Sequence, residues 1–390
     1  MTKRRKTDWR QLLRSFAVGA AIAAAMLCMI PLFPELRAFL TGPMIRDGLG
    51  VFMAYWMAAL LLFWVVMLLQ TVIHEAGHLV CGLLTGYRFS SFRIGSFMLY
   101  RGDEGLRFGR FSVAGTGGQC LMEPADAADP ESMPYRIYLL GGVAANVVAA
   151  AAAFVASRYV SCVLGNYLLA AIVMTGVLAA LLNGIPMRMG GVPNDGCTVR
   201  MMGRSAEMRR MMWVQLKINA LYSRGMMLRD MPDEWFRLPA EADMSNHLYA
   251  AVAGLDASRR MECRDFAGAY DRLETMRAAG DELIGLFRME AACEQMAACV
   301  LTHRPRTEIE RIFTADVERY ARLYSRYMIS RAVTIYIWER FVRRDGAKAS
   351  EAARRVRVMA GRYPVRGETA ACVELLDWIE TLDDEEHGVD

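Results

Sequence analysis

An uncharged apolar run, residues 51–73, is followed by three residues whose types and spacing suit metal-dependent hydrolysis. His74, Glu75 and His78 form an HExxH motif. On a helix the two histidines lie one turn apart on one face, so they can hold a single zinc ion. Glu75 then lies beside the metal's water, where a carboxylate can act as a general base. The motif predicts a zinc-dependent peptidase centre in a membrane segment.

Chance is the alternative explanation for a motif with three fixed positions. The chain has only five histidines in 390 residues, and two of them fall here. Ionisable groups are costly beside a bilayer core, where they usually mark a functional site. The metal-site interpretation is therefore favoured over an accidental match.

A catalytic zinc takes three protein ligands and leaves one position for water, so the two histidines need a partner. Asp195 offers a hard oxygen ligand at the end of the last long apolar run, and Pro193 and Gly196 bend the chain around it. Pro-Asn-Asp-Gly is by itself an ordinary turn sequence. In combination with HExxH, Asp195 becomes the leading candidate for the third ligand. Cys81 and Cys197 flank the motifs, and apolar packing is their favoured role.

Together these motifs resemble the site-2 protease family of intramembrane zinc metalloproteases, over about residues 50–200. That family carries HExxH, then Gly-x-x-x-Asn, then a segment with Asn and Pro that ends in Asp-Gly. Here they correspond to residues 74–78, 142–146 and 183–196. The resemblance implies that His74, His78 and Asp195 hold Zn²⁺ and that Glu75 is the catalytic base.

Two asparagines are candidates for contact with substrate. Asn146 or Asn183 could donate a hydrogen bond to the substrate backbone or to the developing oxyanion, and hydrogen bonding between membrane helices is the alternative for both. The chain also departs from the family pattern. Val143 stands where the family has proline, and the extra residues 189–191 lengthen the loop before Asp195.

The elements that must position these residues are membrane spans. Hydrophobic residues make up 54% of the chain, mean hydropathy is +0.18, and the long uncharged runs nearly all precede Met187. A spanning helix needs about 20 apolar residues. Four spans are predicted within a membrane metalloprotease domain, residues 16–200, at about residues 16–33, 51–73, 137–157 and 160–183. Residues 1–15 form a basic leader; a cleavable secretory signal is the alternative to an uncleaved first span.

Charge placement predicts the orientation and limits the partners. Arginines gather in the leader and in the loop between the second and third spans, so both termini are expected in the cytoplasm of a multi-pass protein of the cell membrane. Nine cysteines without a CxxC pair suit a reducing compartment. A dispersed net charge of +4 argues against nucleic acid as a partner.

Between the second and third spans, aromatic and β-branched residues partly alternate. They predict a β-hairpin at about residues 87–113, with strands over 87–100 and 106–113 and a turn at the intervening glycines. An exposed strand edge could hold a substrate in extended form by strand addition.

The second half of the chain carries interspersed charges and apolar residues at helical spacing. It predicts an all-α cytoplasmic domain of helical hairpins, residues 201–382, that resembles tetratricopeptide helices in places without a clear repeat of 34 residues. This domain could bind a cytoplasmic protein. Residues 383–390 form an acidic tail. The predicted fold class is thus mostly α: a polytopic membrane bundle with a small β-hairpin insertion, followed by a helical domain.

The leading function is an intramembrane zinc metalloprotease that cuts membrane-associated or transmembrane substrates near the cytoplasmic face. An inactive adaptor that presents membrane clients through its helical domain is the alternative, and the intact Glu75 speaks against it. A metal-ion transporter is weakened by the small number of spans and the lack of a visible inverted repeat.

Overall fold

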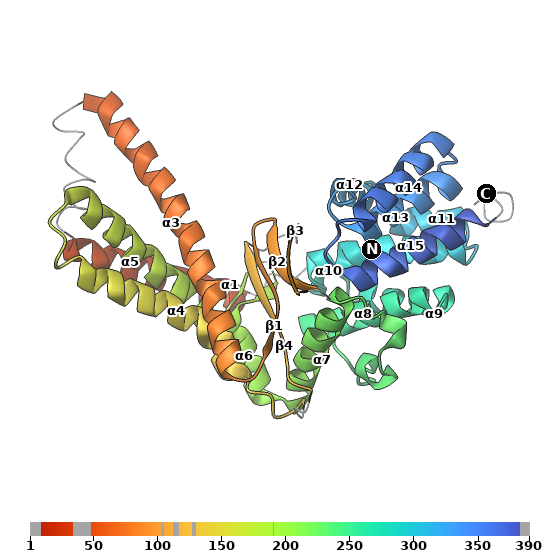
Figure 1. Ribbon diagram of the computed structural model, residues 1–390, viewed down its shortest axis with the longest axis horizontal. Coiled ribbons are helices and arrows are strands. Elements are labelled where there is room, and N and C mark those ends of the chain that lie inside the picture. Colours follow the sequence, from red (N-terminus) through yellow and green to blue (C-terminus); the bar gives the residue numbers. More distant parts are fainter. Residues whose placement is uncertain are drawn as a thin grey trace. The chain divides into compact units, whose positions relative to one another are not determined.

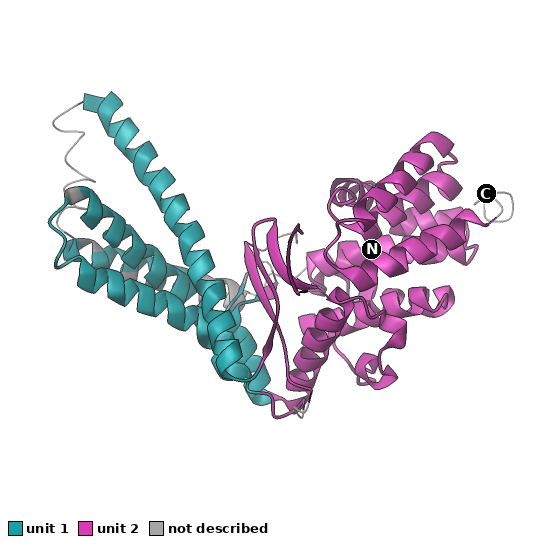
Figure 2. Ribbon diagram, in the orientation of Figure 1, with its two compact units in different colours: residues 1–86, 134–189, 193–204 teal, residues 87–133, 190–192, 205–390 magenta. Residues whose placement is uncertain are grey.

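The computed structural model describes residues 9–33, 48–102, 105–111, 117–126, 130–189 and 191–382. The first eight residues of the predicted leader and the predicted acidic tail lie outside the described residues. The chain divides into two compact units (Figure 2). Unit 1 comprises residues 1–86, 134–189 and 193–204, and unit 2 comprises residues 87–133, 190–192 and 205–390.

Unit 1 is a bundle of apolar helices (Figure 1). Its helices are α1 (Trp9–Met29), η1 (Ile30–Leu32), α3 (Gly48–Leu84), α4 (Tyr135–Ala156), α5 (Val163–Gly184) and α6 (Asp195–Arg204). Within the described part of the chain, α3, α4 and residues Leu164–Gly184 of α5 are long and apolar enough to cross a membrane. The apolar stretch Gly19–Met29 of α1 is shorter, so the span at residues 16–33 stays a prediction.

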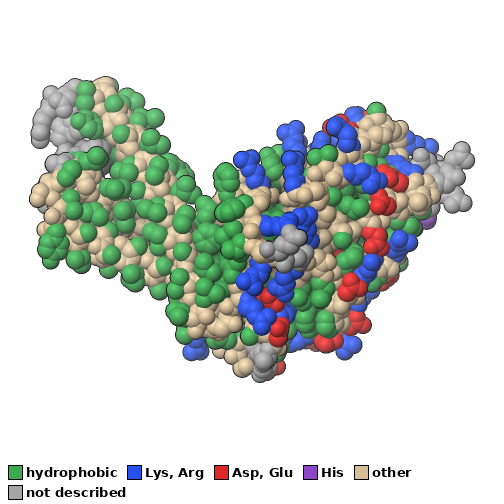
Figure 3. Space-filling model, in the orientation of Figure 1, with side chains coloured by type: hydrophobic (Ala, Val, Ile, Leu, Met, Phe, Trp, Pro, Cys, Tyr) green, Lys and Arg blue, Asp and Glu red, His purple; other side chains and the backbone are tan. Residues whose placement is uncertain are grey.

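Helix α3 carries the HExxH motif on its buried side. Its outward residues are large and apolar, with Leu61 67% and Met57 66% exposed. On the face shown in Figure 3, hydrophobic side chains cover most of unit 1, whereas Lys, Arg, Asp and Glu gather on unit 2. Because lipid offers no hydrogen bonds, an outer apolar surface on a continuous helix is what a membrane requires. The predicted span, residues 51–73, lies within α3, and the helix continues beyond it through the motif to Leu84.

Two glycines set the distance between α3 and α4. A Cβ added to Gly77 would lie 2.2 Å from the Gly141 carbonyl oxygen, and one added to Gly141 would lie 2.4 Å from the Gly77 oxygen. Only residues without a side chain allow the backbones to approach so closely. The backbone of α3, which carries the HExxH motif, therefore packs in direct contact with the backbone of α4, which carries Asn146.

Unit 2 contains a four-stranded antiparallel sheet rather than a simple hairpin. Its strands are β1 (Arg88–Ile94), β2 (Phe97–Gly102), β3 (Gly105–Arg110) and β4 (Gly118–Glu123), in the order β3-β2-β1-β4. The prediction of one strand over residues 87–100 was wrong. Gly95 has φ +58°, a conformation that favours glycine, and it turns the chain between β1 and β2. The pairing of β2 with β3 is the predicted hairpin, whereas β4 was missed.

The rest of unit 2 is helical. Its helices are α7 (Ala206–Ser223), η2 (Leu228–Asp230), η3 (Asp233–Phe236), α8 (His247–Glu262), α9 (Phe266–Arg277), η4 (Gly280–Glu282), α10 (Gly285–Leu301), α11 (Arg306–Ile312), α12 (Ala315–Tyr324), α13 (Ile329–Ile337), the π-helix η5 (Trp338–Val342), α14 (Gly346–Ala360) and α15 (Arg366–Glu380). Asp265 and Asp345 cap α9 and α14 by accepting a backbone N–H from the first turn. A continuous core includes Phe266, Phe341 and Leu376.

A buried ionic cluster joins the sheet of unit 2 to its helices. Glu123, on β4, is 1% exposed and accepts hydrogen bonds from Lys217 at 2.7 Å and from Arg224, both on or beside α7. Burial opposes ionisation, but these hydrogen bonds hold the pKa of Glu123 below its usual range. Asp126 also pairs with Lys217. The charge buried on the sheet is therefore matched by α7.

Candidate metal centre

Three potential ligand atoms converge in unit 1, two from α3 and one from the start of α6. His74 Nε2 lies 3.1 Å from His78 Nε2 and 3.0 Å from Asp195 Oδ2, and His78 Nε2 lies 3.6 Å from the same oxygen. Both histidines are buried, with exposures of 8% and 5%. The structure thus brings together three residues that lie up to 121 positions apart, 195 minus 74, in the sequence.

The hydrogen bond of His78 Nδ1 determines which of the two ring nitrogens carries the proton. His78 Nδ1 lies 2.8 Å from the carbonyl oxygen of Tyr138, on α4. A carbonyl can only accept, so the proton sits on Nδ1 in this contact. In the neutral ring, Nε2 then carries a lone pair that faces the cluster.

His74 is oriented in the same way through Asn146. His74 Nδ1 lies 2.8 Å from Asn146 Oδ1, and Asn146 Nδ2 donates to the Gln70 backbone oxygen at 3.0 Å and to Gln70 Oε1 at 2.7 Å. Gln70 Nε2 in turn donates to the Ile172 carbonyl, on α5, at 2.9 Å. Because backbone carbonyls only accept, they fix both amide orientations and make Asn146 Oδ1 the acceptor for His74 Nδ1–H.

These residues fit a divalent metal. Two inward lone pairs and a carboxylate oxygen repel one another unless a cation lies between them, and Asp195 Oδ2 is buried without a hydrogen-bond partner among the described residues. Tetrahedral zinc with bonds of about 2.0–2.1 Å places its ligand atoms roughly 3.3 Å apart. The separations of 3.0, 3.1 and 3.6 Å lie close to that value. Within the described residues, this is the group of His, Cys, Asp and Glu side chains that could hold a metal ion.

The segment before Asp195 is organised by Asn194, a residue that sequence reasoning passed over. Asn194 Oδ1 accepts from the Cys197 and Met187 backbone N–H groups at 2.9 and 3.1 Å, and Nδ2 donates to the Leu182 and Ile185 carbonyls at 2.6 Å. Asn194 therefore caps α6 and ties it to the end of α5. The signal was present, because asparagine before Asp-Gly is a good N-cap as well as a turn residue.

Two further glycines fit the centre closely. A Cβ on Gly196 would lie 2.1 Å from the Gly184 carbonyl oxygen, and a Cβ on Gly142 would lie 2.6 Å from His74 Cε1 and Nε2. The glycine of the Asp-Gly motif thus allows α6 to reach the end of α5. Gly142, from the Gly-x-x-x-Asn motif, leaves space for the first histidine.

The other predicted site residues are placed as follows. Glu75 is 8% exposed and adjoins His74 on α3. Asn183 Nδ2 donates to Ala179 O at 2.9 Å within its own helix. Cys81 packs at the Gly141 crossing, since a Cβ added to Gly141 would lie 2.8 Å from Cys81 Cβ. Sequence reasoning missed Gln70, whose signal was a polar residue four positions before His74 in an apolar span.

A metal-binding cluster on a bundle of membrane-spanning helices defines the class of membrane metallopeptidases. The model of Peptidase family M50 matches residues 62–344, and the chain belongs to this family, the site-2 protease family that the motifs resemble. The match runs well beyond residue 200, into the helices of unit 2. No curated protein and no solved structure matches the chain. The chain is accordingly a multi-pass integral membrane metallopeptidase.

Proposed function

We propose that the chain is a zinc endopeptidase that hydrolyses membrane-associated or transmembrane substrates near the cytoplasmic face. The observation that carries this proposal is the convergence of two oriented imidazoles from α3, an apolar helix long enough to cross a membrane, with a carboxylate from the start of α6. Such a ligand set leaves a fourth position for water or substrate.

Each residue has a distinct role in the proposed reaction. His74, His78 and Asp195 would hold Zn²⁺, which when bound lowers the pKa of a water towards about 7 and polarises the scissile carbonyl. Glu75 accepts a proton from the water as its oxygen attacks the carbonyl carbon. Glu75 then delivers that proton to the departing nitrogen as the C–N bond breaks, so it is regenerated.

Asn146 is better suited to positioning than to oxyanion stabilisation. Both amide hydrogens of Asn146 are donated to Gln70, and its oxygen accepts from His74. These contacts support the alternative role that the sequence offered for Asn146, a hydrogen bond between membrane helices. Because one of them holds His74, Asn146 also orients a metal ligand. Asn183 keeps its proposed role as a donor to the substrate.

A transmembrane substrate is helical, and this conformation limits how it can be cleaved. Its peptide bonds are engaged in hydrogen bonds and shielded by side chains, so a substrate must become extended before water can attack. Strand addition to the sheet of unit 2 is the proposed means, and the helices of unit 2 are the proposed contact for a cytoplasmic partner.

Zinc content of the detergent-purified chain provides the first test. We expect about one zinc per chain, lost in His78→Ala and in Asp195→Ala and retained in His303→Ala, an exposed histidine outside the cluster. Zinc that is absent from gently purified wild type, or unaffected by both ligand variants, would overturn the proposed centre.

Activity needs a separate comparison. Single-span peptides with a helix-destabilising Gly or Pro, reconstituted with the protein in liposomes, are suitable substrates. Wild type should cleave a subset of them, and Glu75→Gln should lose cleavage while keeping its zinc. Zinc binding without cleavage by wild type across this panel would favour the membrane adaptor, and cleavage retained by Glu75→Gln would exclude Glu75 as the base.

A further inference from the structure

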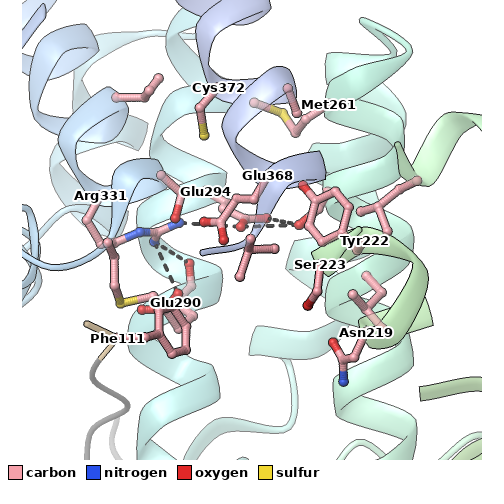
Figure 4. Close-up of a pocket in the computed structure, with 18 of the residues that line it drawn as sticks. Phe111, Asn219, Tyr222, Ser223, Met261, Glu290, Glu294, Arg331, Glu368 and Cys372 are labelled. Carbon is pink, nitrogen blue, oxygen red and sulfur yellow. Dashed lines mark hydrogen bonds and ion pairs between the residues drawn. The ribbon is translucent and has the colours of Figure 1, made fainter. Parts of the chain in front are cut away.

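Unit 2 contains a cavity of about 400 Å³ that lies wholly outside the metal centre. Its walls come from one face of the sheet, including Ser91 and Met98, and from helices α7, α8, α10, α13 and α15. In the close-up of Figure 4, Arg331, Glu294, Glu368 and Tyr222 point toward one another across it. Ligand pockets for small molecules begin at about 300 Å³, so the cavity has room for a small organic compound.

Carboxylates outnumber cationic side chains in the lining. Six charged residues line the cavity, two of them arginines and four of them glutamates: Arg93, Arg331, Glu262, Glu290, Glu294 and Glu368. Buried ionisable groups are normally matched in charge. The lining has two more carboxyl groups than guanidinium groups, which is unusual for buried side chains.

Arg331 forms ion pairs with two of these glutamates, Glu290 and Glu294. It is 1% exposed, and its guanidinium lies 3.4 Å from Glu294 Oε1 and 3.8 Å from Glu290 Oε2, and donates to the Glu290 backbone oxygen at 3.2 Å. Two carboxylates more than balance its charge. An anionic ligand would have to displace one of them, so Arg331 does not make the cavity an anion site.

The two remaining carboxyl groups, those of Glu262 and Glu368, accept their hydrogen bonds from neutral groups. Glu262 Oε2 accepts the Arg229 backbone N–H at 2.9 Å, and its Oε1 is buried without a hydrogen-bond partner among the described residues. Glu368 Oε2 accepts from the Tyr363 hydroxyl at 3.1 Å. Burial raises the pKa of Glu262 and of Glu294 to about 7 and also raises that of Glu368. A cation placed beside Glu262 and Glu368 would favour their ionised forms and pair with them.

We propose that this cavity binds a small organic cation, an amine or guanidine on an apolar body. The cationic group would pair with Glu262, whose free oxygen accepts it, and with Glu368. The body would pack against apolar lining residues such as Leu255, Met261 and Leu375. Pairing an ammonium with a buried carboxylate gives a charge-assisted hydrogen bond to both groups, which a neutral ligand cannot form.

Matched fragments on the full-length, detergent-purified protein test the charge preference. Phenethylamine, 2-phenylethanol and 3-phenylpropionate share an aromatic body and differ in the charge of the head group, and further sets with other bodies extend the comparison. Binding is measured by saturation-transfer NMR at pH 7.5. We expect the amines to bind at least 10-fold more tightly than the alcohols and acids of the same shape.

Variants locate the site. Glu262→Gln should weaken amine binding at least 10-fold, and Glu351→Gln, an exposed glutamate on α14, should leave it unchanged. Equal binding of amines and alcohols, preference for the acids, no amine binding at millimolar concentration, or undiminished binding in Glu262→Gln would each overturn the proposal. The comparison of fragments uses wild type alone, so it remains decisive if Glu262→Gln does not fold.

Discussion

Replacing Gly142 by alanine should displace one metal ligand, His74, without unfolding α4, the helix that carries the glycine. The new Cβ would lie 2.6 Å from His74 Cε1 and Nε2 and 2.7 Å from Nδ1. Ordinary contacts begin at 3.4 Å, so the ring has to move by about 0.8 Å, which is 3.4 minus 2.6. Metal–ligand distances tolerate only about 0.2 Å. The displacement is therefore too large for His74 to keep its position.

The expected loss can be bounded. Disturbing the outer-shell partner of a ligand costs about 10–100-fold in metal affinity, and moving the ligand itself should reach at least the upper value. That corresponds to about 2.7 kcal/mol of binding free energy. Alanine is a better helix former than glycine by roughly 0.5–1 kcal/mol, so α4 itself should persist.

The assay is competition for zinc against a chromophoric chelator, with far-ultraviolet circular dichroism as the check on folding. Gly50→Ala is the matched control, because a Cβ there meets no atom within 4 Å. Its zinc affinity should equal that of wild type. A Gly142→Ala protein that binds zinc within threefold of wild type would refute the argument that this glycine makes room for His74.

Three other changes test separate parts of the structure. Asn194→Ala removes the cap of α6 and should lower zinc affinity about 10–100-fold while the helices remain, measured by the same chelator competition; unchanged affinity would show that Asn194 does not hold Asp195 in place. Glu123→Ala leaves the buried Lys217 with only the exposed Asp126 as its partner and should lower the free energy of unfolding in urea by about 3 kcal/mol, whereas Glu310→Ala, in an exposed pair, should cost at most about 1 kcal/mol; equal losses would contradict the burial argument. Glu294 has a folded-state pKa of about 7 against 4.5 for an unperturbed side chain, so the folded state binds more protons between these values. Glu294 should then make the free energy of unfolding fall as pH rises from about 4.5 through about 7, by about 3 kcal/mol, and urea unfolding at pH 5 and 7.5 should show a smaller slope in Glu294→Gln than in wild type. Glu262, whose pKa is also raised to about 7, keeps its own share of the slope in this variant, and a slope unchanged from wild type would contradict the raised pKa of Glu294.

Local patterns in the sequence determined the main elements of unit 1 and the metal ligands within them. Uncharged runs long enough to span a bilayer predicted the cores of α3, α4 and α5, because membrane helices satisfy their backbone internally and need only length and apolarity. The spacing of His74 and His78 placed both on one helix face. Asp195 required the resemblance to a family, since Pro-Asn-Asp-Gly alone is also a turn.

Only the tertiary structure decided how these ligands are oriented. The bond between His74 and Asn146 joins residues 72 positions apart, and the bond from Gln70 to Ile172 joins residues 102 apart. No periodicity in the sequence encodes such pairings, because they depend on how closely α3, α4 and α5 approach one another at small residues.

The sheet and the cavity of unit 2 also have features that the sequence predicts and features that only tertiary packing decides. Alternation predicted the β2–β3 hairpin, but β4 carries little alternation of its own. Its residues pair with β1 across 24 positions, from Ile94 to Gly118, up to 35 positions, from Arg88 to Glu123. The glutamates of the cavity look like ordinary charged positions on amphipathic helices. The raised pKa values of Glu262 and Glu294 arise from burial, which packing between distant helices creates and which no single helix pattern reveals.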